Sequence, residues 1–354
     1  MQPIKGSQVL MFVGALVIVA AIGLSFIKVF QATPPAAPEL SRVLSEPKTI
    51  GVLTVSQYGD VVVGLKEGLK ELGYTNVTFK EVLFETKATE QDVANLAKEL
   101  IAEKVDLLYV PGEFWALWII NATKTIGNST PIVHFSNFHD PVAYGLAKSF
   151  LSSGNNATGV SMNIAEVIQK QLEFLRKLRP DSKKIGVFGK GFGIPFIGGE
   201  WLNALKQQAP RLDYEVVEYT TDVSPPNVES AFHDLIAKFK RGDVDALYHI
   251  GGHYYGDQQT AETELAERLQ IPMIVPLEDL PTGGHFGYSA DFLSSGKQTA
   301  KMVDKIFRGA KPSNIPLEHA EKIFLVVYPT RARQAGVEFP ESILSIATQI
   351  VNDK

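Results

Sequence analysis

The 354-residue sequence contains no cysteine. Disulfide bonds, thiolate metal sites, a cysteine nucleophile and a lipid-modified N-terminal cysteine are therefore all excluded. Long runs of basic residues are also missing, and the net charge of -5 opposes electrostatic capture of nucleic acid. These absences leave small molecules and other proteins as the expected partners, with no nucleic acid among them.

Complete enzyme motifs are missing as well. Gly287 to Asp291, GYSAD, begins like the nucleophile elbow G-x-S-x-G but lacks its second glycine. Gly189 to Gly193, GKGFG, follows a predicted strand but lacks the last glycine of the dinucleotide-binding motif. His249 and His253 have the spacing of a helical zinc pair, yet two glycines separate them and the HExxH glutamate is absent. We predict no catalytic residue, no metal site and no cofactor, and hence no enzyme.

The N-terminus, by contrast, is strongly apolar. Val9 to Ile27 carries no charge and precedes Lys28, and its length is close to the ~20 residues that span a bilayer. A cleaved signal peptide usually has a shorter apolar region and small residues at its cleavage site, a pattern that Phe30-Gln31-Ala32 fits poorly. We predict a single-pass transmembrane anchor over residues 1–30, with a signal sequence as the alternative, and an extended Pro/Ala-rich linker over 31–47.

From Lys48 onward, short β-branched segments alternate with amphipathic segments of helical period, which is typical of an α/β fold with doubly wound parallel sheets. The pattern includes a helix that begins after Asp140, and it repeats after the Gly/Asn-rich segment Ser152 to Gly159. We therefore predict two Rossmann-like lobes joined by a hinge that the chain crosses several times. Lobe one is expected to contain residues 48–158 plus 285–318, and lobe two residues 159–284 plus 319–354.

The predicted topology also indicates where a ligand binds. Ligands of open parallel sheets bind outside the carboxyl ends of the strands, where loops lead into helices. The loops at these positions combine aromatic, Ser, Asn and acidic side chains, which suits an amino acid or a similar small zwitterion. Trp115 is expected in a ligand wall and Trp118 in the core. The candidate ligand-binding residues are Gln57, Tyr58, Glu113, Phe114, Trp115, Ser136, Asn137, Phe192, His253, Tyr254, Glu278 and Asp279.

An acidic residue is expected to bind the ammonium group of such a solute. Glu113, Glu278 and Asp279 are the candidates, because each follows a predicted strand in one of these loops. Asp140 is expected instead to cap the segment that follows it.

Several segments resemble one known family. Pro131 to Ser161 is similar to a family segment in which a strand precedes D-P-V-x-x-G-L and a G-N-x-T-G crossover. Lys170 to Pro180 resembles the family's K-x-L-E-x-L-x-x-L-x-P, and Val303 to Pro316 resembles V-D-K-I-L-x-G-x-K-P-x-x-L-P. Through these segments the chain resembles the ABC-transporter substrate-binding proteins, which implies a type I periplasmic-binding-protein fold.

The resemblance also implies a function. Proteins of this kind are two-lobed clamps that close on a small solute and deliver it to an ABC permease, and members are similar to amino-acid binders. The expected location is the cell membrane with the binding domain extracytoplasmic, although Lys5 and Lys28 on either side of the apolar segment do not decide the orientation. A membrane-tethered sensory or receptor module with the same clamp is the alternative.

Overall fold

The computed structural model of the chain describes residues 37–192, 195–223, 227–251 and 256–352. The chain divides into two units, Met1–Glu46 and Pro47–Lys354. The first unit contains helix α2 (Ala37–Ser45), so the prediction of an extended linker over residues 31–47 was wrong for this segment. Leu40, Val43 and Leu44 follow the i, i+3, i+4 spacing of a helix, and a proline is tolerated in the first helical turn.

The predicted membrane anchor, residues 1–30, lies outside the described residues. Among the helices that are described, none is both long enough and apolar enough to span a bilayer. The anchor remains a prediction from the sequence.

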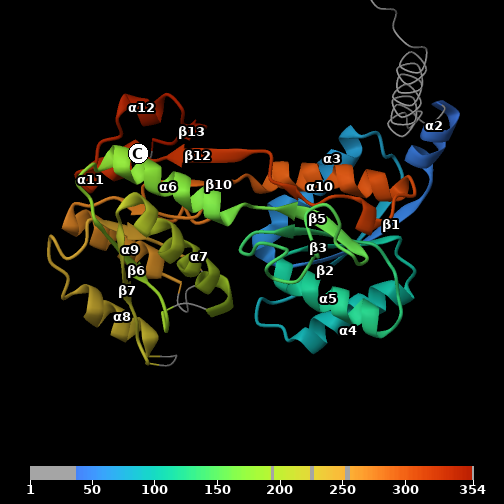
Figure 1. Cartoon of the computed structure of the whole chain (residues 1–354), viewed down its shortest axis with the longest axis horizontal. Coiled ribbons are helices and arrows are strands. Elements are labelled where there is room, and N and C mark those ends of the chain that lie inside the picture. Colours follow the sequence, from blue (N-terminus) through green and yellow to red (C-terminus); the bar gives the residue numbers. More distant parts are fainter. Residues whose placement is uncertain (1–36, 193–194, 224–226, 252–255, 353–354) are drawn as a thin grey trace, which may run out of the picture. The chain divides into compact units, whose positions relative to one another are not determined.

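The second unit contains two sheets, and the first is a six-stranded parallel sheet with the order β11-β5-β4-β3-β1-β2. Its central strands are buried along their whole length because helices cover both faces: α3 and α10 pack together on one face, and α4 and α5 on the other (Figure 1). We call this sheet with its helices lobe one. Its elements are β1 (Lys48–Thr54), α3 (Gly59–Glu71), β2 (Val77–Leu83), α4 (Glu90–Ala102), β3 (Leu107–Pro111), α5 (Glu113–Thr125), β4 (Ile132–Ser136), β5 (Ala157–Ser161), α10 (Phe292–Phe307) and β11 (Glu318–His319).

The second sheet has seven strands in the order β13-β12-β10-β9-β8-β6-β7. All its pairings are parallel except that of β10 with β12. We call this sheet with its helices lobe two. Its elements are α6 (Ile164–Leu178), β6 (Lys184–Phe188), α7 (Pro195–Gln208), β7 (Glu215–Tyr219), α8 (Val228–Ile236), β8 (Ala246–Tyr248), α9 (Gln258–Leu269), β9 (Met273–Ile274), β10 (Phe286–Ala290), β12 (Ile323–Val327), α11 (Pro329–Gln334), α12 (Glu341–Leu344) and β13 (Gln349–Ile350).

Polar side chains fix the starts of several helices. Thr89 and Asp92 form a reciprocal capping box at the start of α4, and Asn163 caps α6 by accepting a hydrogen bond from the Glu166 amide. Asp291 caps α10 in the same way. Such caps satisfy amides that have no partner inside the helix, so each helix begins at a defined residue.

Three segments connect the lobes, as the predicted multi-crossing hinge requires. The chain leaves lobe one after β5, returns to it after β10 and leaves it again after β11. Hydrogen bonds join these segments to each other: the Ala320 amide donates to the Ser161 carbonyl at 2.9 Å, and the Asp291 amide donates to the Lys322 carbonyl at 3.1 Å. The three crossings are therefore tied to one another by backbone hydrogen bonds.

Two predicted lobe boundaries differ from the structure. Strand β5 belongs entirely to the first sheet, so the first crossing follows residue 161 and not residue 158. Strand β10 pairs with β9 and β12 in the second sheet, although residues 285–318 were expected in lobe one. Both differences have one cause. The residue pattern indicates that a segment forms a strand, but it does not indicate which sheet the strand joins.

The helix predicted after Asp140 is absent from the described structure. Asp140 Oδ1 accepts hydrogen bonds from the Val142 and Ala143 amides at 2.9 and 2.8 Å, so the expected capping interaction is present. A turn follows instead of a helix, because Gly145 adopts a φ of 90° and interrupts the helical conformation.

Close packing of α3 on α10 depends on glycine, which gives a test of the fold. A Cβ added to Gly64 would lie 2.0 Å from the Leu293 carbonyl oxygen. We expect Gly64→Ala to lower the free energy of unfolding by about 1–3 kcal/mol, because two helix backbones must separate. Gly59→Ala in the same helix is the control, since an added Cβ there meets nothing within 4 Å. Urea unfolding followed by circular dichroism measures the free energy of unfolding of both variants. Equal values for the two would contradict this account.

Candidate ligand-binding site

Polar and aromatic side chains gather where the carboxyl ends of the strands of the two lobes face each other. From lobe one come Tyr58, in the short 3-10 turn Ser56–Tyr58 after β1, and Asn137 directly after β4. From lobe two comes Glu278, which follows β9. The Asn137 side chain interacts with both the Tyr58 hydroxyl and the Glu278 carboxylate. The two lobes therefore meet through a polar contact at this point.

Glu113 holds the loop that carries Asn137. Its carboxylate is fully buried and accepts hydrogen bonds from the amides of Asn137 (3.0 Å) and Phe138 (2.7 Å). The ring Nδ1–H of His139 donates to the same carboxylate at 2.8 Å. A buried carboxylate with three donors is already satisfied. The expectation that Glu113 binds an ammonium group was therefore wrong, since this residue shapes the loop instead.

The oxygen of the Asn137 side chain is left without a partner. Asn137 is 2% exposed, and its Oδ1 has no hydrogen-bond donor in the described structure. Because a buried acceptor without a donor costs about 1–3 kcal/mol, such atoms usually serve a ligand or a bound water. This oxygen is well placed to accept a hydrogen bond from a cationic group at the site.

Glu278 and Asp279 form an acidic pair on the opposite wall. Burial first, and next the neighbouring Asp279 carboxylate, raise the pKa of Glu278 to about 7. The side chain still reaches solvent through the space between the lobes. A cation bound here would reverse part of this shift, because it stabilises the ionised form of the carboxyl group.

A buried polar network supports this acidic pair from behind. His249 donates from Nδ1 to Glu262 Oε2 at 2.7 Å, and its Nε2 lies 3.7 Å from Asp279 Oδ2. Burial alone would lower the pKa of His249, but Glu262 and then Asp279 outweigh burial and raise it. The imidazole therefore retains its proton more readily and partly balances the charge of Asp279.

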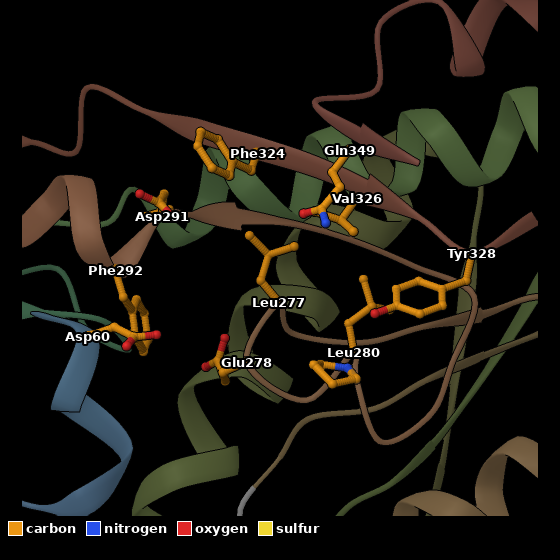
Figure 2. A pocket seen from close by; sticks show the side chains of 12 residues that line it. Asp60, Leu277, Glu278, Leu280, Asp291, Phe292, Phe324, Val326, Tyr328 and Gln349 are labelled. Atoms are coloured by element: carbon orange, nitrogen blue, oxygen red, sulfur yellow. The ribbon is translucent and has the colours of Figure 1, made fainter. Parts of the chain in front are cut away.

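A pocket of about 320 Å³ adjoins these groups and is lined by residues of both lobes. Figure 2 shows Asp60 and Phe292 of lobe one across from Leu280 and Tyr328 of lobe two, with Glu278 between them. Among the described residues that line this pocket there is no lysine or arginine. The remaining lining residues are Leu277, Pro281, Ala290, Asp291, Phe324, Val326 and Gln349.

Several candidate residues are buried in the lobes and do not face this pocket. Trp115 is 3% exposed and packs edge-on against Tyr58 and Phe84, whereas Trp118 is only partly buried, the reverse of the expected order. Phe114 packs against Trp115 within lobe one. The apolar faces of these rings are used within the core, so they support the loop rather than form a ligand wall.

The other candidates lie in the cores of the lobes, at a separate pocket, or outside the described residues. Ser136 is buried and its hydroxyl pairs with His134 at 3.0 Å, and Phe192 lies in the aromatic core of lobe two. Gln57 is exposed and lines a separate open pocket with Leu83 and Phe84. The remaining two, His253 and Tyr254, lie outside the described residues.

The sequence interpretation missed Asp60, Phe292 and the network of His249 with Glu262. Asp60 stands only two residues after Tyr58, so extending that loop into the first turn of α3 would have found it. Phe292 follows the crossing from β10, and its role depends on that strand being placed in lobe two. His249 and Glu262 meet only because α9 packs against β8, which no local pattern indicates.

One further contact joins the lobes. His139 Nε2 lies 3.8 Å from Glu200 Oε1 of α7, while its Nδ1 binds Glu113. The loop that Glu113 organises therefore touches lobe two through both Asn137 and His139. These features together define two lobes that contact each other beside a pocket lined by residues of both.

Comparison with known proteins agrees with this two-lobed arrangement. A tyrosine-binding protein of Clostridioides difficile (strain R20291) is 25% identical over 267 residues, covering 75% of this chain and 73% of that protein. A domain from Streptococcus pneumonia solved in complex with L-Trp has a TM-score of 0.69 at 22% identity, covering 86% of this chain and 100% of that one. The ligand-free, open structure of a substrate binding protein with adhesive properties from Clostridium difficile gives a TM-score of 0.65 at 21% identity, covering 87% and 100%.

The chain belongs to the ABC transporter substrate binding protein family, which matches residues 54–351. The family resemblance predicted from the sequence is thereby confirmed, as is the expectation of a binding protein rather than an enzyme. The solved structures also agree with an α/β fold of two lobes with largely parallel sheets, like that of type I periplasmic binding proteins.

The raised pKa of Glu278 predicts how stability depends on pH. The folded protein binds this proton more tightly than the unfolded chain, so ionising Glu278 destabilises the fold as the pH rises from about 4.5 to about 7. We expect Glu278→Gln to gain stability relative to the wild type as the pH rises from 5 to about 8. Urea unfolding of the ligand-free chain at both pH values measures this difference. Parallel pH profiles for the two proteins would contradict it, and Glu264→Gln, an exposed change on α9, is the control.

Proposed function

We propose that this protein is the solute-capturing component of an ABC importer and that it binds an amino acid or a similar zwitterion between its lobes. The observation that carries the proposal is the meeting of Asn137 of lobe one with the Glu278–Asp279 pair of lobe two. Membership in the substrate-binding family supports the transport role. In such a system an ABC permease receives the solute.

The charges of the site favour a ligand with an ammonium group. Glu278 and Asp279 supply negative charge, and the Asn137 oxygen is a buried acceptor without a donor. An ammonium group has three N–H donors and no acceptor, which suits a site that offers carboxylate and amide oxygens. The same contacts would offer nothing favourable to an anionic group.

The size and lining of the pocket favour a single amino acid. A volume of about 320 Å³ lies at the lower end of the range for small-molecule sites. Leu277, Leu280 and Phe292 provide apolar surface for a hydrophobic or aromatic side chain. One relative is named a tyrosine-binding protein, and a structure with the same fold was solved with L-Trp, which agrees with an aromatic amino acid.

The clamp explains how binding could be linked to delivery. A ligand that bonds to Asn137 on one wall and to Glu278 on the other makes its full set of contacts only when the lobes are close together. It therefore favours the closed state by the difference between its contacts in the two states. The three hydrogen-bonded crossings permit such a movement without breaking either sheet.

We also propose that residues 1–30 hold the protein in the cell membrane with the binding domain extracytoplasmic. Support comes from the uncharged segment Val9 to Ile27 and from the role of substrate-binding proteins in solute capture. Fractionation of cells, with protease added outside them, tests this location. We expect the full-length chain in the membrane fraction and its cleavage by the external protease. Recovery of the whole chain, intact, from the fraction inside the cell would overturn it.

The ammonium requirement can be tested with an aromatic amino acid and the α-hydroxy acid that carries the same ring. We expect L-tyrosine or L-tryptophan to raise the melting temperature, since a ligand at ~100 times its Kd adds about 2.7 kcal/mol to stability. The matching α-hydroxy acid, which lacks the ammonium group, should give no shift at the same concentration. Equal shifts from the amino acid and the hydroxy acid would contradict the proposed role of the acidic pair. A response to sugars or nucleosides alone would overturn the amino-acid assignment.

Variants of the acidic pair that keep the size of the side chain test whether its charge contributes to amino-acid binding. Asp279→Asn keeps the size of the side chain but removes its charge, so we expect amino-acid affinity to fall by about 10- to 100-fold. Glu278→Gln should behave similarly above pH 7 and differ less from the wild type at pH 5, where Glu278 is already protonated. Isothermal titration calorimetry measures these affinities, with Glu264→Gln as the control.

A further inference from the structure

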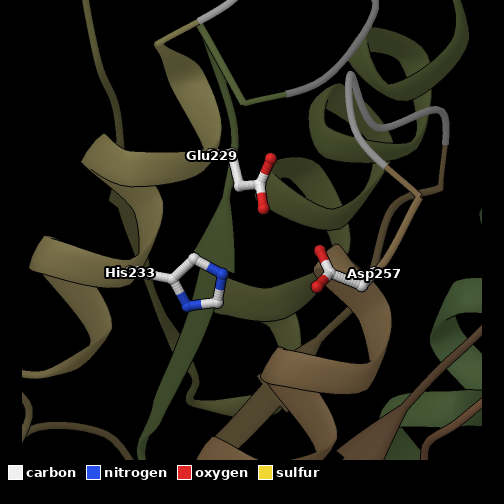
Figure 3. Close-up of side chains that lie close together, drawn as sticks. All are labelled: Glu229, His233 and Asp257. Carbon is white, nitrogen blue, oxygen red and sulfur yellow. The ribbon is translucent and has the colours of Figure 1, made fainter.

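A second group of potential ligands lies on lobe two, among residues that the binding pocket does not use. Glu229 and His233 of α8 and Asp257 at the start of α9 each offer a donor atom, and these atoms lie within 4.8 Å of one another. Figure 3 shows the three side chains converging from the two helices. All three are exposed, so an ion can reach them from solvent.

The positions in the sequence explain why the side chains converge. Glu229 and His233 are four residues apart on α8, so they lie on the same face of the helix one turn apart. Asp257 occupies the N-cap position of α9, yet its side chain makes no capping hydrogen bond. Its carboxylate is turned toward α8 instead, where it meets the other two groups.

Among the residues that the structure describes, no salt bridge or side-chain hydrogen bond joins the Glu229 or Asp257 carboxylate to another group. Two negative groups held close together repel each other, and a bound cation would convert this repulsion into attraction. The arrangement is thus more favourable with a metal ion than without one.

From this geometry we propose that Glu229, His233 and Asp257 form a site for a divalent transition metal such as Zn²⁺. One imidazole nitrogen and two carboxylate oxygens are ligands that zinc commonly uses, whereas an all-oxygen set would favour Mg²⁺ or Ca²⁺. Metal–ligand distances are about 2.0–2.2 Å, so donors within 4.8 Å need only small side-chain rotations to bind one ion. Water completes the coordination at this exposed position.

The bound metal would link two helices of lobe two. α8 follows β7 and α9 follows β8, so both begin at the carboxyl edge of the second sheet, the edge that also carries Glu278. A metal held by both helices would tie α8 to the start of α9. We therefore expect the metal to stabilise lobe two without itself contacting the amino-acid pocket.

Calorimetric titration of the full-length, untagged chain with ZnCl2 tests the site. We expect one equivalent to bind, together with a rise in melting temperature. Loss of an outer-shell partner alone typically lowers metal affinity by about 10–100-fold, so His233→Ala and Asp257→Asn should each lower it by at least about tenfold. Asp234→Asn, an exposed change beside His233, is the matched control and should bind Zn²⁺ like the wild type.

Other outcomes would overturn the proposal. Binding of Zn²⁺ with the same affinity by His233→Ala would place the ion at another histidine. The absence of stoichiometric binding, or equal binding of Mg²⁺ and Zn²⁺ by all variants, would show that the three side chains form no specific metal site. Circular dichroism of each variant without metal checks that a lost affinity does not reflect a lost fold.

Discussion

The buried carboxylate of Glu113 organises the loop on which the proposed binding site depends. It lies at the first position of α5, away from solvent, and accepts hydrogen bonds from the amides of Asn137 and Phe138 and from the His139 ring. A carboxylate in such a place is tolerated only if donors surround it, because an unpaired buried charge is very costly. The loop after β4 thus has one favourable conformation. In that conformation Asn137 and His139 face lobe two.

The wall that lobe two contributes differs from this loop because it carries two neighbouring carboxylates. These carboxylates are Glu278 and Asp279, and burial together with the charge of Asp279 raises the pKa of Glu278. His249 and Glu262 support the pair from behind without cancelling its charge. One wall of the proposed site is therefore a polar loop that Glu113 holds in place, while the other carries negative charge that a ligand can neutralise. This asymmetry gives the proposed clamp a physical reason to close on a cationic group.

Most secondary structure could be predicted from local patterns. The alternation of β-branched and amphipathic segments predicted both sheets, since burial of a parallel strand and of one helix face leaves a clear mark on the sequence. Errors arose where local signals compete: Gly145 stops a helix after Asp140, and apolar spacing forms α2 despite its proline, Pro38. The site was harder to predict. Glu113 and Phe192 follow strands just as Glu278 does, but their side chains turn into the protein.

By itself the sequence determined the α/β class, the two lobes, the family and the loops that could meet a ligand. These properties follow from periodicity and from motifs, which are local along the chain. Only the tertiary structure decided that β10 belongs to lobe two, that Glu113 supports a loop, and that Glu229, His233 and Asp257 converge. Each of these depends on contacts between residues far apart in the sequence. Packing between distant segments sets the burial and the charge environment at such contacts, so they cannot be predicted from any single segment of the chain.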